Sequence, residues 1–379
     1  MSQTSGIPFK HAISRLMGHR HQMSISHMTN VISAALPLPE HCPVNQTPAA
    51  MSQPILPVVP AVAKCPVDGF LHTRYEGRMI PAFIAPDAID ALRNSWDTTA
   101  DDIIICTHQK VGTHLTKKFV MEILRTAGVL NDAHPGAQGD IGKSAVPWPE
   151  VMVSQKGMSA FQDFLDSTAG QPRVFYTHGN IDELPVRFLH PETKIVMTYR
   201  DPKGAAVSQY HFYKNHPTLG VSEDMSMASF VKHFVEGDLY FGDYHAHVAG
   251  YFQPEAHGVR KEQVCVMRFE DLVEDKMQAV RQLAGFLVPT TILSEEQVFQ
   301  VAASTEFNTM KQGIIKNPGS FHFNPNKFFR SGKTDDWKEQ MSASCIDAIN
   351  AKTEAQWGAP DAPGTNAAGG NGNFRNLAA

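Results

Sequence analysis

Short apolar runs alternate with amphipathic segments along the middle of the chain. Four runs have the length and the β-branched content of buried strands: Ile103–Thr107, Arg173–Thr177, Lys194–Tyr199 and Gln263–Arg268. Apolar residues at helical spacing predict helices in the segments between and after them: from Thr113 to a stop at Gly128, Lys203–Tyr213, Met225–Glu236, Tyr244–Phe252 and Lys276–Leu287. This alternation predicts an α/β fold, a single domain with a mainly parallel central sheet flanked by helices.

Polar residues follow three of these strands directly. Lys110 comes just after the first strand, His178 after the second and Arg200 after the third. In an open α/β sheet, ligands bind beyond the carboxyl ends of the strands. We therefore expect these three side chains to meet at one rim.

The first strand leads into a turn that has the chemistry of an anion site. Lys110 supplies a charge, Gly112 allows the backbone to approach a ligand closely, and Thr113 adds a hydroxyl at the start of a helix. Helix N-termini offer free N–H groups and the positive end of the dipole. The Walker A order is not satisfied, because the lysine precedes the glycine. The turn therefore predicts a phosphorylated donor other than a nucleoside triphosphate.

Composition narrows the class of protein. The chain has 379 residues, of which 42% are hydrophobic, enough for one large domain with extensions. With 33 basic and 38 acidic residues, the net charge of −5 argues against a general nucleic-acid binder, although a basic pocket for a small polyanion is compatible. The five cysteines have no metal-ligand spacing, which favours reduced thiols and no metal. No apolar run is long enough to span a membrane, so we expect no membrane partner.

The two ends of the chain differ from its middle. Residues 1–70 contain no acidic residue before Glu40 and many prolines, which predicts a disordered N-terminal extension. A transit peptide for an organelle is the alternative, and a cytoplasmic location is expected otherwise. Residues 71–358 are expected to form the domain, and 359–379 a disordered tail.

Six ordered segments between Arg78 and Trp357 resemble those of the cytosolic sulfotransferases, which use 3′-phosphoadenosine-5′-phosphosulfate (PAPS). The turn at 108–115 resembles the family's 5′-phosphosulfate loop, and Thr198–Tyr213 resembles its 3′-phosphate segment. Phe329–Lys338 resembles the Arg-Lys-Gly-x-x-Gly-Asp-Trp-Lys signature. The other three are Thr177-His178, Gly237–Val248 and Phe269–Leu272. The resemblance implies the P-loop-like sulfotransferase fold.

The resemblance also implies the residues of the site. Those expected to bind the donor are Lys110, Val111, Gly112, Thr113, His114, Leu115, Arg200, Ser208, Phe269, Thr305, Phe307, Phe329, Arg330, Ser331 and Gly332. Thr305 and Phe307 lie in the segment that resembles the adenine-contacting one, so Phe307 is expected to stack on the base.

The expected catalytic residues are His178, Lys110 and Ser208. A hydroxyl is a poor nucleophile until it loses its proton, and an imidazole titrating near neutral pH can accept that proton. His178 is therefore the expected general base, with His114 and His108 next. Lys110 would stabilise the leaving oxygen, and Ser208 would hydrogen-bond Lys110 before the acceptor arrives.

Some positions depart from the family pattern. The family's lysine two residues before the catalytic histidine is Tyr176 here, Ser331 replaces a lysine, Asp335 replaces a glycine, and Leu115 replaces an aromatic residue. These changes predict weaker donor binding. The family's dimer motif is poorly matched at Lys338–Asp347, so a homodimer stays open.

The predicted partner is a small-molecule acceptor with a hydroxyl or an amine. Val146–Met152 and Ile80–Phe83 are expected to form its pocket, where Trp148 and Phe83 favour a flat or apolar molecule; ordinary packing is the alternative. The predicted function is PAPS-dependent sulfuryl transfer. The alternatives are a catalytically weak relative that binds PAPS or its product with a sensing or scaffold role, and a P-loop kinase.

Overall fold

The computed structural model describes residues 72–130, 146–216, 219, 222, 224–316 and 324–358, all of which fall in one compact unit. The predicted N-terminal extension (1–70) and tail (359–379) lie outside the described residues, so both stay predictions.

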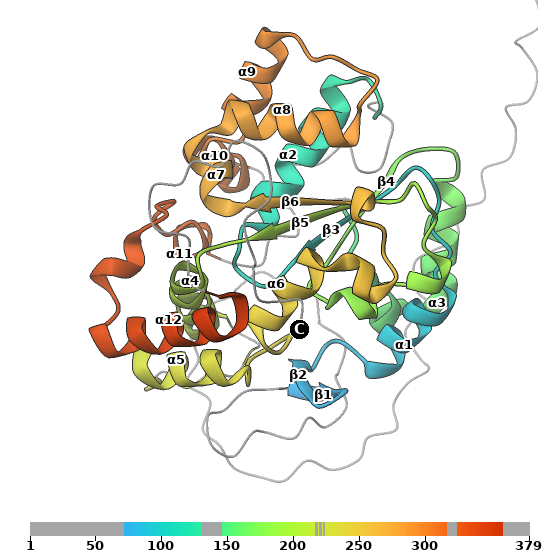
Figure 1. Ribbon diagram of the computed structural model, residues 1–379. Coiled ribbons are helices and arrows are strands. Elements are labelled where there is room, and N and C mark those ends of the chain that lie inside the picture. Colours follow the sequence, from blue (N-terminus) through green and yellow to red (C-terminus); the bar gives the residue numbers. More distant parts are fainter. Residues whose placement is uncertain are drawn as a thin grey trace, which may run out of the picture. The chain divides into compact units, whose positions relative to one another are not determined.

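A parallel sheet forms the centre of this unit (Figure 1). Its strands are β3 (Asp102–Thr107), β4 (Arg173–Thr177), β5 (Lys194–Tyr199) and β6 (Val264–Arg268). Their order is β4-β3-β5-β6, and every neighbouring pair is parallel. The predicted α/β class is therefore confirmed. All six residues of β3 are buried, which explains why its sequence is a continuous apolar run and not an alternating one.

Helices cover both faces of the sheet and enclose a hydrophobic core on each side (Figure 1). One face carries α2 (Thr113–Thr126), α8 (Lys276–Leu287) and α9 (Glu295–Ser304). The other carries α1 (Pro86–Ser95), α3 (Pro149–Ser167), α4 (Pro202–Asn215), α5 (Met227–Glu236), α6 (Tyr244–Phe252) and α12 (Ala343–Trp357).

Shorter elements complete the described chain. β1 (His72–Tyr75) and β2 (Arg78–Pro81) form an antiparallel hairpin. The remaining helices are α7 (Phe269–Glu274), α10 (Phe307–Lys316), α11 (Pro325–Phe328) and the 3₁₀ turns Ile181–Glu183, Val186–Phe188, Pro254–His257, Lys261–Gln263 and Asp336–Glu339.

The helices differ in whether a side chain caps their N-terminus, and this difference affects the site. Asp201 caps α4 by accepting a hydrogen bond from the backbone N–H of Lys203, and Pro202 occupies the first turn. Asp243 caps α6 in the same manner. Helix α2 begins instead at Gly112 with no side-chain cap, so its first N–H groups stay available for a ligand.

A buried ion pair joins the starts of β3 and β4. Arg173 contacts Asp102 through two bonds, Nε to Oδ1 at 2.5 Å and the terminal nitrogen to Oδ2 at 2.6 Å. Their side chains are only 6% and 0% exposed. We expect Arg173→Met to lower the free energy of unfolding by about 3–5 kcal/mol, because it leaves the Asp102 carboxylate buried and without its cation. Denaturant unfolding measures this loss.

The exposed pair Arg281–Glu295 provides the control, with side chains 40% and 75% exposed. Arg281→Met should change stability by less than about 1 kcal/mol, since exposed pairs contribute little. Equal losses in the two variants would contradict a special role for the buried pair.

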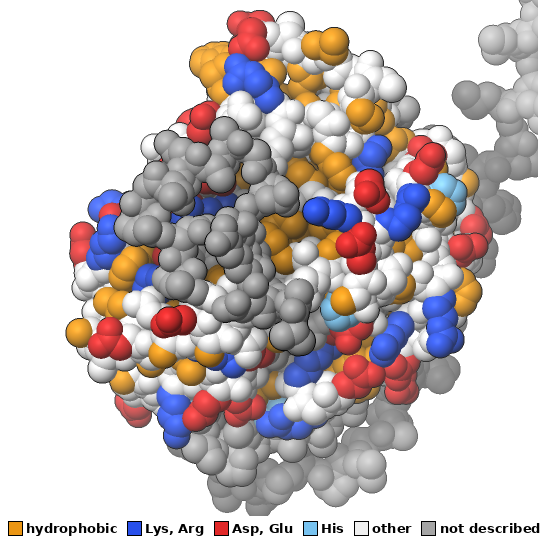
Figure 2. All heavy atoms as spheres, in the orientation of Figure 1, with side chains coloured by type: hydrophobic (Ala, Val, Ile, Leu, Met, Phe, Trp, Pro, Cys, Tyr) orange, Lys and Arg blue, Asp and Glu red, His pale blue; other side chains and the backbone are white. Residues whose placement is uncertain are grey.

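The face shown in Figure 2 carries acidic and basic side chains interspersed, with hydrophobic atoms between them. Among the described residues, no helix is both long and apolar enough to cross a membrane.

Candidate active site

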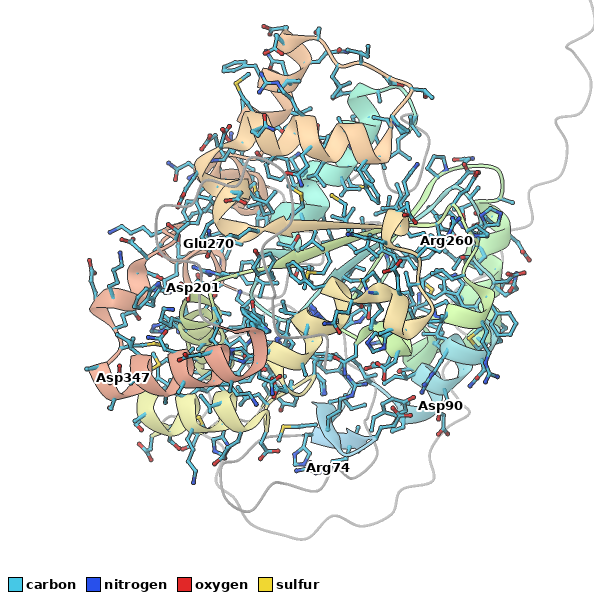
Figure 3. The ribbon with its side chains drawn as sticks, viewed as in Figure 1. Arg74, Asp90, Asp201, Arg260, Glu270 and Asp347 are labelled. Carbon is cyan, nitrogen blue, oxygen red and sulfur yellow. The ribbon has the colours of Figure 1, made fainter. Side chains whose placement is uncertain are left out.

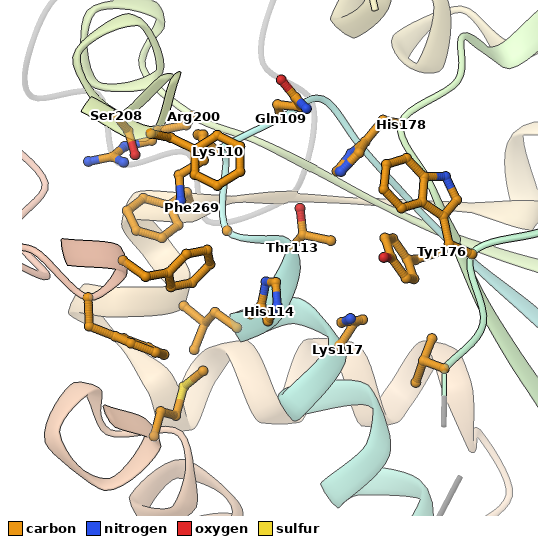
Figure 4. Close-up of a pocket in the computed structure, with 18 of the residues that line it drawn as sticks. Gln109, Lys110, Thr113, His114, Lys117, Tyr176, His178, Arg200, Ser208 and Phe269 are labelled. Atoms are coloured by element: carbon orange, nitrogen blue, oxygen red, sulfur yellow. The ribbon is translucent and has the colours of Figure 1, made fainter. Parts of the chain in front are cut away.

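A cavity of about 780 Å³ opens at the carboxyl ends of β3, β4 and β5. Lys110, His178 and Arg200 all line it, which confirms that the three strand ends bring these residues together (Figure 4). Lys110 and His178 lie on opposite sides of Thr113, so an anion at the start of α2 would lie between them.

The turn before α2 has a backbone built for close approach. Lys110 adopts a φ of 64° and Gly112 a φ of 109°, both in the left-handed region. A Cβ at Gly112 would lie 2.6 Å from Cδ2 of Phe269, so only glycine fits there without a shift. The turn thus presents bare backbone N–H groups at the uncapped helix start, as anion binding requires.

Lys110 is a half-buried cation that lies against two aromatic rings. Its Nζ lies 4.6 Å from the ring centre of Phe212 and 3.9 Å from that of Phe328. Burial, together with the charges of Arg200 and Arg330, lowers the pKa of Lys110 to about 7. Ser208 also lines the cavity, but no hydrogen bond joins it to Lys110 in the described residues. The hydrogen bond expected between them is thus not formed here; the rings take its place.

Arg200 is fixed at both its backbone and its side chain. The Tyr244 hydroxyl accepts from the Arg200 N–H at 2.9 Å and donates to the Arg200 carbonyl at 2.5 Å. The guanidinium lies 4.4 Å from the Phe269 ring centre and 4.0 Å from Oε1 of Glu270. Its Nε is buried and has no hydrogen-bond partner, but it lies against Gly204, where a Cβ would be only 2.8 Å away, and one terminal nitrogen donates to the Lys333 carbonyl at 3.1 Å. An anion in the cavity would therefore meet the terminal nitrogens and not Nε.

Glu270 positions this end of the cavity through the backbone as well. It accepts a hydrogen bond from the N–H of Asp201 at 3.1 Å, and the two residues lie near one another in Figure 3. Its other oxygen is 3.1 Å from Nε of Arg268. Arg200 therefore shares Glu270 with Arg268, so its own charge is only partly neutralised.

The signature segment at 329–338 forms the next wall. Arg330 pairs with Asp336, which also accepts a hydrogen bond from Ser331 at 2.8 Å. Gly332 has a φ of 68°, and a Cβ there would lie 2.6 Å from Cδ2 of Phe307. The segment therefore packs tightly against the aromatic residue that was expected to stack on adenine.

The expected base-binding residues gather at this same end. Phe307 and Phe329 make an edge-to-face contact with ring centres 5.7 Å apart, and Leu115 packs against them. Thr305 also lines the cavity. This is an apolar slot of the kind that a purine ring needs.

His178 has its tautomer set by the backbone. Its Nδ1 lies 2.7 Å from the carbonyl oxygen of Thr107, which can only accept, so Nδ1 carries the proton and Nε2 keeps its lone pair. Burial first, and then the charges of Lys117 and Lys110, lower the pKa of His178 to about 4. The sequence predicted titration near neutral pH; burial makes His178 a neutral base over a wider range.

His108 and His114, the other two candidates for the general base, differ in position. His108 is buried in the core against Tyr244 and does not line the cavity; its Nδ1 lies 3.1 Å from Nε2 of Gln209. Burial lowers its pKa to about 3. His114 does line the cavity, and burial lowers its pKa well below the ordinary value.

Aromatic and apolar side chains form the opposite end of the cavity. Phe83 and Trp148 meet edge to face at 6.0 Å, and Trp148 lies 5.0 Å from His178, both between ring centres. Val146, Val151 and Met152 join them. The predicted segments 146–152 and 80–83 thus come together, although Ile80 itself is buried in the core.

Several residues of the cavity wall were not among the predicted ones. Val111, which was predicted to bind the donor, has a buried side chain and does not line the cavity, so any contact with the donor would be through its backbone. The cavity residues that were not anticipated include Gln109, Lys117, Phe212, Lys276, Phe328 and Lys333. Of these, Lys117 could have been found from its spacing of four from Thr113. Within the described part of the chain, no group of His, Cys, Asp and Glu is placed to hold a metal ion.

Proteins that are similar to this chain in sequence include sulfotransferases. Sulfotransferase 6B1 of Danio rerio is 26% identical over 257 residues, covering 68% of this chain and 78% of that protein. Sulfotransferase 2B1 of Mus musculus is 25% identical over 287 residues, covering 74% and 78%.

Two solved structures share the fold. Mouse sulfotransferase SULT7A1 complexed with PAP has a TM-score of 0.60 at 22% identity and covers 75% of this chain and 94% of that one. Retinol dehydratase in complex with androsterone and the inactive cofactor PAP has a TM-score of 0.60 at 17% identity, covering 78% and 91%.

The sequence model of the sulfotransferase domain matches residues 100–359. Because this match spans more than half of the chain and contains β3 to β6 with the residues around the cavity, the protein belongs to the sulfotransferase domain family.

Proposed function

We propose that this protein transfers a sulfuryl group from PAPS to a hydroxyl or amine of a small-molecule acceptor, with His178 as the general base. The observation that carries the proposal is the placement of a neutral imidazole and a half-buried lysine on one cavity, on either side of an uncapped helix start. A base for the acceptor and a cation for the leaving group are the two functions that this reaction needs.

The residues around the cavity fit the two charged ends of the donor. Lys110 and the free N–H groups of α2 suit the 5′-phosphosulfate, and the Arg200 guanidinium on the cavity wall suits the 3′-phosphate. The slot beside Phe307 suits the adenine. Structures of the same fold were solved with the product PAP, which supports this assignment.

The reaction would proceed in line, by analogy with phosphoryl transfer. His178 Nε2 accepts the acceptor's proton as the new bond to sulfur forms. The bond between sulfur and the 5′-phosphate oxygen breaks, and its electron pair stays on PAP. Lys110 then faces the charge that develops on that oxygen. Every step uses a group that lines the cavity.

The acceptor end favours a flat, apolar molecule. Phe83, Trp148 and Met152 offer aromatic and thioether surface beside His178. Retinol dehydratase, which shares the fold, was crystallised with androsterone and with retinol. Phenols, sterols and aryl amines are therefore the first acceptors to test.

The test measures PAP and sulfated product together. The protein is incubated with PAPS and a panel of phenols, sterols and aryl amines, and both products are quantified by mass spectrometry. We expect them to form in equal amounts with at least one acceptor. Binding of PAP by calorimetry without turnover on any of them would favour the catalytically weak binding relative. Failure to bind PAP or PAPS would overturn the proposal.

A further inference from the structure

Lys117 is a buried cation on the cavity wall to which the mechanism above gives no task. Lys117 is only 5% exposed, and it lines the cavity. No carboxylate pairs with it among the described residues; its Nζ lies instead 4.1 Å from the ring centre of Tyr176. The next residue, Lys118, behaves as an ordinary helix lysine and contacts Glu122 at 3.0 Å.

The geometry of α2 directs Lys117 toward the proposed anion site at the start of the helix. Lys117 follows Thr113 by four residues, so both lie on the same face of the helix. Long side chains in a helix lean back toward its N-terminus, which here is the uncapped start of the helix. Figure 4 shows the ammonium of Lys117 pointing into the cavity between Tyr176 and His114, below Thr113.

The ammonium of Lys117 also lies close to the two histidines of the cavity wall. Its charge lowers the pKa of both His178 and His114, as the charge of Lys110 does. Burial lowers the pKa of Lys117 itself to about 7, and the aromatic ring of Tyr176 only partly replaces lost hydration. A bound anion would restore this charge.

We propose that Lys117 is a catalytic residue that binds the sulfuryl oxygens as the group passes from PAPS to the acceptor. This inference rests on the proposed function. Lys110 contacts the leaving side of the group and His178 the attacking side, while Lys117 reaches the equatorial oxygens from below Thr113. Charge on those oxygens is what a loose in-line transfer must stabilise.

Binding of PAPS and of PAP provides the first test, because the two differ only in the sulfuryl group. Lys117→Met keeps the stem and removes the charge. We expect it to weaken PAPS binding about tenfold in calorimetry, while PAP binding stays within about twofold. Lys118→Met is the matched control on the same helix and should change neither affinity.

Relocating the charge gives the second test. Since Nζ lies 4.1 Å from the Tyr176 ring, a lysine at position 176 reaches the same part of the cavity. Lys117→Met should lower kcat, or the rate of acceptor-free hydrolysis of PAPS, about tenfold, and Tyr176→Lys added to it should recover most of that loss. Because the family's lysine stands at this position, Tyr176→Lys in the wild-type background is the reference, and it should raise kcat far less there than in the Lys117→Met background.

Four results would overturn the inference, three of them with the Lys117→Met variant. One is a Lys117→Met protein with wild-type PAPS affinity and wild-type kcat. Another is an equal loss of PAPS and PAP affinity, which would place Lys117 on the phosphates. The third is a change confined to the KM of the acceptor. A wild-type protein that binds PAP but not PAPS would also overturn it, whereas failure to bind either would overturn the proposed function with it.

Discussion

Replacing His178 with alanine is expected to lower kcat for sulfuryl transfer about a hundredfold or more, the usual contribution of a general base. The Kd for PAP should stay within about twofold, since the imidazole faces the acceptor end and not the phosphates. The reason lies in one hydrogen bond: the Thr107 carbonyl fixes the proton on Nδ1 and leaves Nε2 able to accept. Initial rates, measured with an acceptor that the wild-type protein sulfates, give the size of the loss.

The pH dependence of kcat/KM adds a second readout for His178. The pKa of His178 is about 4, so the neutral base forms as pH rises through 4, and the rate should rise with it. The pKa values of Lys110 and Lys117 are about 7, so both lose charge as pH rises through 7 and the rate should fall. In His178→Ala, the rise in rate on the acidic side of the pH profile should disappear, whereas the fall on the alkaline side should remain.

Two further variants control for packing and for the identity of the base. His178→Gln can still hydrogen-bond the Thr107 carbonyl but cannot take up a proton, so it should be as slow as the alanine variant. His114→Gln changes another histidine that lines the cavity and should retain most of the activity. If His178→Ala keeps about a third of wild-type turnover, which is far outside the range for a general base, the role belongs to another group.

Replacing Arg200 with methionine is expected to weaken PAP binding by about tenfold to a hundredfold, since a planar guanidinium can give a phosphate one or two charge-assisted hydrogen bonds. The Arg200 side chain lines the cavity, and the hydrogen bond that one terminal nitrogen donates to the Lys333 carbonyl at 3.1 Å leaves the other terminal nitrogen for the phosphate. Calorimetry with PAP measures the change directly. Arg200→Lys should recover only part of the affinity, because an ammonium lacks the fork.

Arg268→Met is the matched control for Arg200. Arg268 contacts the same carboxylate, Glu270, at 3.1 Å, but it does not line the cavity. Its loss should leave PAP binding within about twofold, because charges outside a site are screened by solvent. Unchanged PAP affinity in Arg200→Met would contradict the assignment of this arginine to the 3′-phosphate.

The sequence was most informative about the parallel sheet. The predicted bounds of β4 and β5 match the structure, and β3 and β6 differ by one residue at the start. Buried parallel strands are continuous apolar runs, which are easy to recognise. The hairpin β1–β2, helix α1 and helix α3 were not predicted. Their apolar residues depend on packing against distant elements, and α3 is interrupted at Gly157, whose φ is 82°.

The site residues that directly follow a strand were predicted, whereas a site residue on the face of a helix was missed. Lys110, His178 and Arg200 were found because parallel strands carry the residues after them to one edge. Lys117 was missed because a lysine in a helix normally points to solvent. The low pKa of His178 could not be read from the sequence either, since it comes from burial beside residues that fold over it.

The cluster of cations around the cavity also bears on the lifetime of the protein in a cell. Lys110, Arg200 and Arg330 lie close enough that the two arginines lower the pKa of the lysine, so the native state carries mutual repulsion. A nucleotide at a hundred times its Kd would raise the free energy of unfolding by about 2.7 kcal/mol through mass action. Proteases that degrade transiently opened chains would then remove the nucleotide-free protein faster. The abundance of this protein would accordingly follow the supply of activated sulfate.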